Sequence, residues 1–217
     1  MNKHAVSAAV AELLGEPAEG VSSLGGAAYE VRLAGGGRVV AKSHEEPNAV
    51  RAEAASLLWL AAPAVVPIPR LLAENARWLV TDLIRPGSPE RRAAEELGRG
   101  LARLHAAGAP AFGSPPEGGP ADASIGLAPM HNSACATWPE FYGSYRIEPY
   151  LRTALDRGSI GLRDAAVFRQ VIDRLDEIAG PPETPARLHG DLWSGNVLWG
   201  SDGRAWLIDP AAHGGHR

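Results

Sequence analysis

The amino-acid sequence predicts an α+β protein in two lobes, a small lobe with an antiparallel sheet followed by a larger, mainly helical lobe. Three features indicate this class. Alanine supplies 38 of the 217 residues, and alanine favours helix over sheet. The early sequence has short apolar runs separated by glycine pairs and triplets, as in an antiparallel meander. Beyond residue 89 the apolar residues recur at helical spacing instead.

The small lobe is expected to cover residues 1–84 and to hold one sheet. Its predicted elements, in chain order, are a helix over 5–14, strands over 21–24, 28–33 and 38–42, a helix over 48–62 and a strand over 78–83. Asn48 is expected to cap the second helix, because an asparagine side chain accepts hydrogen bonds from the first free amides of a helix. The proline- and glycine-containing segment 85–89 is the predicted boundary between the lobes.

The second lobe is expected to cover residues 85–217. Leu97, Leu101 and Leu104 recur at spacings of four and three, which predicts a helix with one buried stripe. A connection rich in glycine, proline and alanine follows, and we expect weak order there because such long connections are uncommon inside compact domains. The connection covers 108–137, and after it come predicted helices over 138–157 and 163–179 and a hairpin with strands over 196–199 and 206–208.

Composition excludes several classes of protein. A net charge of −4 with 21% charged residues is too negative for a general polyanion binder, so no nucleic-acid partner is expected. The longest apolar run, 57–69, is broken by three prolines and is shorter than the roughly 20 residues of a membrane span. No membrane association is therefore expected. Cys135 is the only cysteine, which excludes an internal disulfide and fits the reducing cytoplasm as the location.

The residues that point most directly to chemistry run from His189 to Asn196 and resume after the predicted hairpin at Asp209. If the hairpin folds back on itself, Asn196 and Asp209 lie side by side and present oxygen atoms, the ligands that Mg²⁺ prefers. Asp191 then lies on the loop that faces the phosphates and can accept the proton of an incoming hydroxyl. A cation and a positioned proton acceptor are the requirements of phosphoryl transfer.

This part of the sequence resembles the fructosamine kinase family. The resemblance rests on the string HGDLWSGN over 189–196, on the 13-residue spacing from Asn196 to Asp209, and on Asp209-Pro210-Ala211 followed by Gly215-His216. The fold of the family is related to that of aminoglycoside phosphotransferases and more distantly to that of protein kinases. The resemblance therefore implies a bilobal protein-kinase-like fold.

The resemblance extends into the small lobe and implies an ATP site there. Lys42 ends a predicted strand as the nucleotide-contacting lysine of the family does, and Glu53 matches the helix glutamate that pairs with that lysine. The segment that matches the adenine-receiving hinge is Val80-Thr81-Asp82-Leu83. Gly25-Gly26 fits a loop that covers the phosphates and fits a plain hairpin turn equally well.

The resemblance also implies the reaction and its residues. Asp191 is the catalytic residue, Asn196 and Asp209 are the Mg²⁺ ligands, and Trp193 stacks on the sugar of the substrate. Phosphate passes from ATP to a sugar hydroxyl of a ketosamine, a fructosamine or ribulosamine carried by a small molecule or a glycated protein amine, in the repair of glycation. The family continues into further helices beyond the position of Arg217, so the helical lobe is expected to be truncated and to leave apolar faces uncovered.

The same residues also fit other interpretations. A related kinase would act on an aminoglycoside, choline or a similar alcohol, and a truncated pseudokinase would bind nucleotide without transferring phosphate. Asp191 and Asn196 also fit a role as loop caps, and Lys42 with Glu53 fits an exposed ion pair of little energetic value. Three histidines near the end of the sequence lack a fourth ligand for a zinc site. The oligomeric state stays open.

Overall fold

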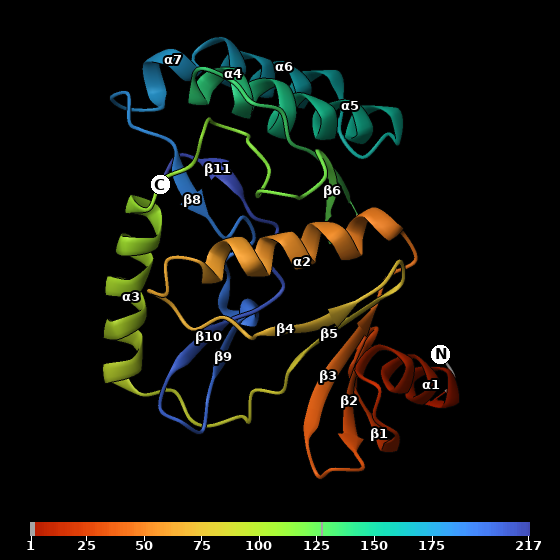
Figure 1. Ribbon diagram of the computed structural model, residues 1–217. Helices are drawn as coiled ribbons and strands as arrows, with labels where there is room; N and C mark the ends of the chain where they lie inside the picture. Colours follow the sequence, from red (N-terminus) through yellow and green to blue (C-terminus); the bar gives the residue numbers. More distant parts are fainter. Residues whose placement is uncertain (1–2, 127) are drawn as a thin grey trace.

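The protein has a five-stranded antiparallel sheet at one end and a group of helices at the other (Figure 1). This computed structural model describes residues 3–126 and 128–217. In spatial order the sheet contains β1 (Ala18–Gly25), β2 (Ala28–Leu33), β3 (Arg38–Ser43), β5 (Trp78–Asp82) and β4 (Leu71–Glu74). The α+β class predicted from the sequence is confirmed. Strand β4, with its short sequence LLAE at the sheet edge, was not predicted.

Helix α1 (Lys3–Leu14) packs against one face of the sheet. Val6 and Val10 are four residues apart, so their side chains share one side of the helix. Both are fully buried, in the same cluster as Val31 of β2 and Val80 of β5. This face of the sheet is therefore closed, and the sites described below lie elsewhere.

Helix α2 (Pro47–Ala61) joins the sheet to the second half of the chain. Leu60 is fully buried in a core that also contains Leu79 of β5 and Leu207 from the far end of the chain. The prediction that Asn48 caps this helix is wrong, because the helix already begins at Pro47 and Asn48 lies inside its first turn. Proline is favoured at the first helical position, where no amide donor is needed.

Helix α3 (Arg91–Ala106) confirms the predicted leucine stripe. Leu104 is fully buried, and Leu97 and Leu101 pack half-buried against the same core. Helix α3 lies beside the short strands near the C-terminus, which form two antiparallel pairs. These strands are β8 (Ala186–Leu188) with β11 (His213–Gly215), and β9 (Val197–Trp199) with β10 (Ala205–Leu207).

The connection over 108–137 is ordered, so the expectation of weak order there is wrong for its described residues. Phe112 and Cys135 are buried together and are joined by a backbone hydrogen bond of 2.8 Å. Between them, β6 (Asp122–Ile125) and β7 (Ala128–His131) form a hairpin that reaches toward α2. The connection is ordered because Phe112 and Cys135 are buried near its two ends and a hairpin forms between them. Its composition, rich in glycine and proline, does not indicate either feature.

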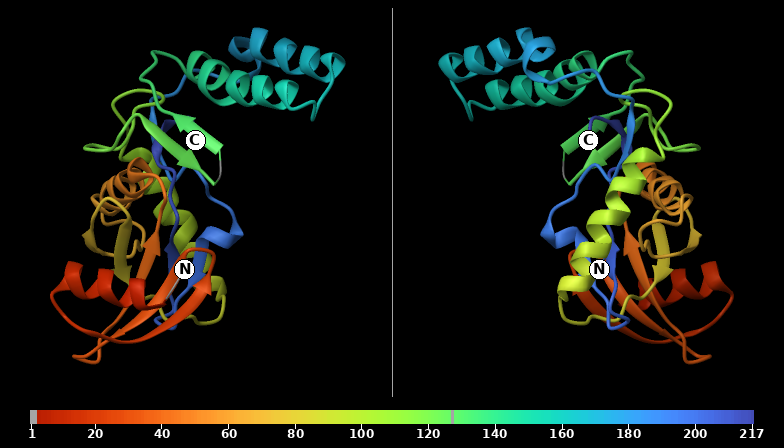
Figure 2. Two further views of the ribbon diagram at one scale, coloured as in Figure 1. Left: turned by 90° about the vertical axis from the view of Figure 1, so that its right-hand side faces the viewer. Right: turned by 90° about the vertical axis from the view of Figure 1, so that its left-hand side faces the viewer.

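The remaining helices form a group that extends to one side of the molecule (Figure 2). The group contains α4 (Trp138–Tyr142), the π-helical turn η1 (Gly143–Ile147), α5 (Glu148–Asp156), α6 (Leu162–Asp173) and α7 (Leu175–Ile178). Helix α6 exposes large apolar side chains, among them Leu162, Val167 and Phe168. Among the described residues, no helix is both long and apolar enough to cross a membrane.

Candidate active site

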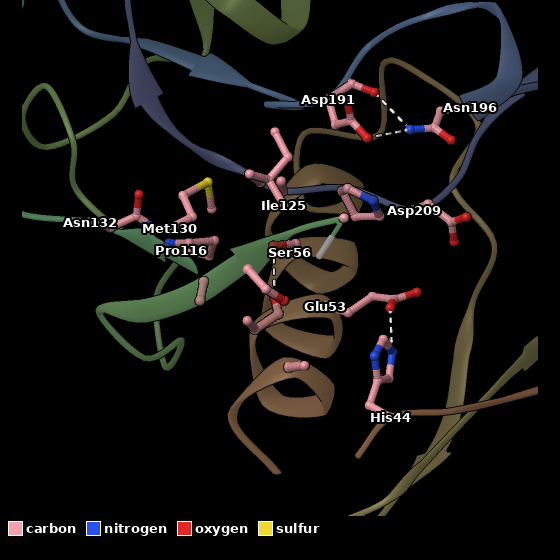
Figure 3. A pocket seen from close by; sticks show the side chains of 18 of the residues that line it. His44, Glu53, Ser56, Pro116, Ile125, Met130, Asn132, Asp191, Asn196 and Asp209 are labelled. Atoms are coloured by element: carbon pink, nitrogen blue, oxygen red, sulfur yellow. Dashed lines mark hydrogen bonds and ion pairs between the residues drawn. The ribbon is translucent and has the colours of Figure 1, made fainter. Parts of the chain in front are cut away.

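The loop between β8 and β9 carries Asp191 and ends in η2 (Ser194–Asn196), a single 3₁₀ turn. Asn196 is buried and donates hydrogen bonds from Nδ2 to the backbone oxygen of Asp191 at 2.8 Å and to its Oδ2 at 3.0 Å. These two bonds hold the Asp191 carboxylate in place. They also turn Oδ1 of Asn196 away from Asp191 (Figure 3).

The side chain of His189 forms hydrogen bonds on both sides of its ring that hold the loop in place. Its Nε2 donates to the backbone oxygen of Ile208 at 2.9 Å, and its Nδ1 accepts a long bond of 3.4 Å from the backbone amide of Asp191. Burial lowers the pKa of His189, although the carbonyl of Ile208 and the charges of Asp191 and Asp209 act in the opposite direction. The neutral ring therefore has a defined tautomer, and it connects the catalytic loop to the segment after β10.

Gly190 allows the backbone of the loop to cross the segment after β10 closely. Its φ is +85°, in the region that favours glycine, and a Cβ at this position would overlap the backbone oxygen of Ala211. The backbone amide of Ala211 donates to the oxygen of His189 at 2.9 Å, so the two segments are also bonded. Glycine is the residue that fits this crossing between His189 and Asp191, because it has no Cβ and tolerates the positive φ.

The hairpin of β9 and β10 brings Asn196 and Asp209 to the same end. Val197 pairs with Leu207, and the amide of Ile208 continues the pairing by donating to the oxygen of Asn196 at 3.1 Å. Asp209 follows directly with φ of +52°, a left-handed conformation that aspartate tolerates better than most residues. Asp191, Asn196 and Asp209 thus border the same cavity (Figure 3).

Lys42 connects this end of the hairpin to the sheet and to α2. Its Nζ lies 2.9 Å from Oε2 of Glu53 and 2.8 Å from Oδ1 of Asp209. Burial would lower the pKa of Lys42, but the charges of Glu53 and Asp209 raise it above its ordinary value. The ammonium group therefore stays charged and bridges two carboxylates, which differs from an exposed ion pair of little value.

Glu53 has a second partner that the sequence did not reveal. Nε2 of His44 lies 2.8 Å from the same Oε2 atom that Lys42 contacts. Burial would raise the pKa of Glu53, but the hydrogen bond from His44 and the charge of Lys42 lower it below its ordinary value. His44 stands two residues after Lys42 in the sequence, on the same side of the extended chain, and this spacing is the signal that would have identified it.

The larger of two cavities at this site, about 800 Å³, lies between the sheet and the hairpin of β9 and β10. The predicted nucleotide-site residues that line it are Gly25, Lys42, Glu53, Thr81, Asp82 and Leu83, and Asp209, a predicted Mg²⁺ ligand, lines it as well. Apolar side chains from both sides complete the lining, with Leu57 and Leu79 from one side and Leu198 and Ile208 from the hairpin. These apolar residues were not predicted to line a site, because the sequence pattern assigns each of them only to a helix or a strand.

Two predicted nucleotide-site residues lie outside the lining of this cavity. Val80 is fully buried and points to the α1 face of the sheet, since neighbouring residues of a strand face opposite sides. Gly26, with φ of +54°, lies in the exposed turn between β1 and β2, whereas Gly25 reaches the cavity. The glycine pair therefore forms a tight hairpin turn, and of the two residues it is Gly25 that borders the cavity.

The smaller cavity, about 400 Å³, shares Lys42, Glu53 and Asp209 with the larger one. It lies between α2, the β6–β7 hairpin and the catalytic loop, and Asp191 borders it. Trp193 also borders it and is 61% exposed. Gly195 provides the space for the indole ring, because a Cβ on Gly195 would overlap that ring.

The donor set at the catalytic loop suits Mg²⁺. Oδ1 of Asp209 bonds Lys42, which leaves Oδ2 of Asp209 and Oδ1 of Asn196 as ligands for a cation. Within residues 3–126 and 128–217 no group of three or more His, Cys, Asp and Glu side chains is placed to hold a metal ion. Two oxygen donors are nevertheless sufficient for Mg²⁺, since it keeps several waters and takes substrate phosphates as its other ligands.

The chain is similar to known proteins both in sequence and in fold. The sequence profile of a family described as fructosamine kinase matches residues 25–217. The chloroplastic protein-ribulosamine 3-kinase of Arabidopsis thaliana is 32% identical over 149 residues, which are 67% of this chain and 43% of that protein. The chain spans about half the length of the curated relatives it matches, from 43% to 57% for the first three.

Two solved structures illustrate the likeness in fold. A structure described as a fructosamine-3-kinase, from Thermobifida fusca, superimposes with a TM-score of 0.88 at 43% identity, over 97% of this chain and 74% of that one. The macrolide 2'-phosphotransferase MphH of Brachybacterium faecium gives a TM-score of 0.58 at 17% identity, over 98% and 73% of the two chains. The second likeness is one of fold alone. Together they confirm the two-lobed, kinase-like fold predicted from the sequence.

Proposed function

The chain belongs to the fructosamine kinase family, and on that premise we propose that it is an ATP-dependent kinase that phosphorylates a sugar hydroxyl of ketosamines. One observation carries the proposal. The ion pair between Lys42 and Asp209 lies where two cavities meet, a larger one with apolar walls and a smaller one bordered by Asp191. A nucleotide in the first cavity directs its terminal phosphate toward an acceptor in the second.

The larger cavity is the proposed nucleotide site. Leu79 and Leu198 lie on its opposite walls and suit the flat faces of a purine, and the segment from Thr81 to Leu83 passes along its edge. Lys42 is the residue available for the phosphates, and Glu53 and Asp209 hold its ammonium group in position. Bound Mg²⁺ would neutralise charge on the transferring phosphate, with Asn196 and Asp209 as its protein ligands.

Asp191 is the proposed catalytic residue. Its carboxylate is fixed by Asn196 and borders the smaller cavity, so it can orient the acceptor hydroxyl and take up its proton. The bond between the terminal phosphorus of ATP and its bridging oxygen breaks as the hydroxyl oxygen binds that phosphorus, so ADP is the leaving group, and the proton of the hydroxyl passes to the Asp191 carboxylate. Fixing the carboxylate in advance favours this transfer, because no reorganisation is needed when the hydroxyl arrives.

The smaller cavity is the proposed acceptor site, with Trp193 as the surface on which the sugar stacks. The relatives named as ketoamine and ribulosamine kinases support ketosamines as substrates, either as small molecules or on glycated protein amines. Removal of sugars from proteins is then the purpose of the reaction. A cytoplasmic location, without nucleic-acid or membrane partners, completes the proposal.

The test is an ATP-consumption assay with Mg²⁺, in which the 217-residue chain meets a panel of fructosamines, ribulosamines, aminoglycosides and choline. We expect turnover with ketosamines and identify the product by a mass increase of one phosphate on the sugar. Turnover confined to an aminoglycoside or choline would replace the ketosamine assignment with a related phosphotransferase. Nucleotide binding without turnover on any acceptor would indicate a pseudokinase.

A further inference from the structure

The acceptor cavity has a second polar side, formed by the β6–β7 hairpin. Ser124, Ile125, Met130 and Asn132 border the cavity from this side, opposite the catalytic residues. Figure 3 shows Asn132 beside Met130 and Pro116, with Asp191, Asn196 and Asp209 on the other side of the view. Asn132 is the only amide side chain lining this side of the cavity among the described residues.

The orientation of the Asn132 amide is fixed by its partner. Asn132 is 3% exposed, and its Oδ1 accepts a hydrogen bond of 2.5 Å from Nη2 of Arg146. A guanidinium group has donors and no acceptor, so the oxygen of the amide must face Arg146 and Nδ2 must face the other way. Within the described part of the chain, Nδ2 of Asn132 has no hydrogen-bond partner. A nearly buried donor at the cavity wall is thus available to a ligand.

Arg146 is itself held by several contacts. It donates from Nη1 to the backbone oxygens of His131 at 2.8 Å and Tyr145 at 3.1 Å, and its guanidinium lies 4.5 Å from the centre of the Phe141 ring. Burial lowers the pKa of Arg146 to about 10, so the side chain keeps its charge at neutral pH. Arg146 belongs to η1, and single π-helical turns within helices occur frequently at functional sites.

These contacts join the helical group to the cavity. Arg146 binds both the last residue of β7 and the side chain of Asn132, so it fixes the end of the hairpin and the amide together. Arg146 is absent from the cavity lining and acts from behind Asn132. Its charge also polarises the amide, which makes Nδ2 a better donor.

We propose that Asn132 is a substrate-binding residue that donates a hydrogen bond from Nδ2 to an oxygen of the ketosamine, and that Arg146 positions it. The proposal rests on the proposed function and deepens it. The oxygen belongs to the part of the acceptor away from the reacting hydroxyl, because Asp191 and Asn132 border different sides of the cavity. The bond selects acceptors that carry an oxygen at this point, since a buried donor left unpaired costs free energy.

The test uses Asn132→Asp, which preserves the shape and the oxygen bound by Arg146 but removes the donor. The matched control is Asn75→Asp, since Asn75 lies in an exposed turn and its Oδ1 accepts bonds from the backbone amides of Arg77 and Trp78. Calorimetric titration with fructoselysine and ribuloselysine measures the Kd. We expect Asn132→Asp to weaken ketosamine binding about tenfold or more, with the nucleotide Kd unchanged, the Tm not lowered because the new carboxylate pairs with Arg146, and the control unaffected.

Arg146→Lys tests the positioning role. It keeps the charge but loses the fork that binds two oxygens at once. We expect it to weaken ketosamine binding in the wild-type background and to add no further loss in the Asn132→Asp background. Equal losses in both backgrounds would contradict the positioning role.

The outcomes separate this inference from the proposed function. Ketosamine binding by the wild-type chain together with an unchanged Kd for Asn132→Asp would overturn the role of Asn132 alone. A wild-type chain that binds nucleotide but none of the ketosamines would overturn the proposed function, and with it this inference.

Discussion

Nζ of Lys42 lies 2.8 Å from Oδ1 of Asp209, although 167 positions separate the two residues in the sequence. Lys42 belongs to β3 of the sheet and Asp209 follows the hairpin of β9 and β10, so this bond connects the two halves of the molecule. The ammonium group also contacts Glu53 of α2 at 2.9 Å. Three elements therefore meet at one lysine, at the point where the two cavities join.

Lys42→Met removes this junction and keeps the length of the side chain. We expect kcat/KM for ATP to fall about 10²-fold or more, because the phosphates lose the cation that positions them. Lys3→Ala is the control, since Lys3 is the other lysine of the sequence and lies exposed on α1. Steady-state kinetics at varied ATP concentration provide the measurement. A rate for Lys42→Met equal to that of the wild type at limiting ATP would contradict the role of Lys42 in positioning the phosphates.

Gly195→Ala tests the position of the Trp193 ring. The added methyl group would overlap the indole, which is 61% exposed and can move at little cost, so the free energy of unfolding should change by less than about 0.5 kcal/mol. We expect KM for the ketosamine to rise several-fold while KM for ATP stays the same. In a Trp193→Ala background the substitution should have no further effect. A second loss of the same size there would show that Gly195 acts independently of the indole.

Gly190→Ala tests the close crossing beneath the catalytic loop. Gly180→Ala is a matched control, because Gly180 has nearly the same φ, +83° against +85°, but no atom lies within 4 Å of its Cβ position. The control should lose about 1–2 kcal/mol for the left-handed backbone alone. Gly190→Ala adds the overlap with Ala211 and should lose more than about 4 kcal/mol in denaturant unfolding. Equal losses of stability for the two variants would show that the backbone of Ala211 can move away from a Cβ at position 190 at little cost.

His213 should make the protein sensitive to acid. Burial, aided by the charge of Arg146, lowers the pKa of His213 from 6.5 to about 4. Between these two pH values the unfolded chain binds a proton that the folded chain does not, so stability falls as the pH falls through this window. The full effect is up to about 3 kcal/mol. Unfolding of wild type and His213→Gln at pH 7 and pH 4.5 should show a smaller acid loss in the variant. If wild type and His213→Gln lose the same free energy of unfolding between pH 7 and pH 4.5, His213 is not a source of the acid sensitivity.

The sequence was most informative where function depends on local spacing. The short apolar runs over 196–199 and 206–208 predicted a hairpin that brings Asn196 and Asp209 to one end, and the pairing of Val197 with Leu207 produces that arrangement. The leucine stripe of α3 was equally clear, because its spacing follows the helical repeat. The roles assigned to these residues in catalysis stay predictions.

Contacts between residues far apart in the sequence could not be predicted from local spacing. Nothing in the spacing indicates that Arg146 binds the side chain of Asn132, or that the hairpin of β6 and β7 borders a cavity with α2. The connection around this hairpin was expected to be weakly ordered because it is rich in glycine, proline and alanine, whereas Phe112 and Cys135 near its two ends are buried and anchor it. Val80 was assigned to the nucleotide site as part of a contiguous segment, although strand alternation alone places it on the opposite face from Thr81.

The central claim is that Asp191 acts on an acceptor hydroxyl in the smaller cavity, and Asp191→Asn tests it most directly. The variant keeps the size of the side chain and the surrounding loop but loses the proton acceptor. Phosphate transfer to ribuloselysine, followed by mass spectrometry of the product, should fall about 10³-fold, while the nucleotide Kd stays within about twofold of wild type. Transfer at a rate close to that of the wild type would contradict the account.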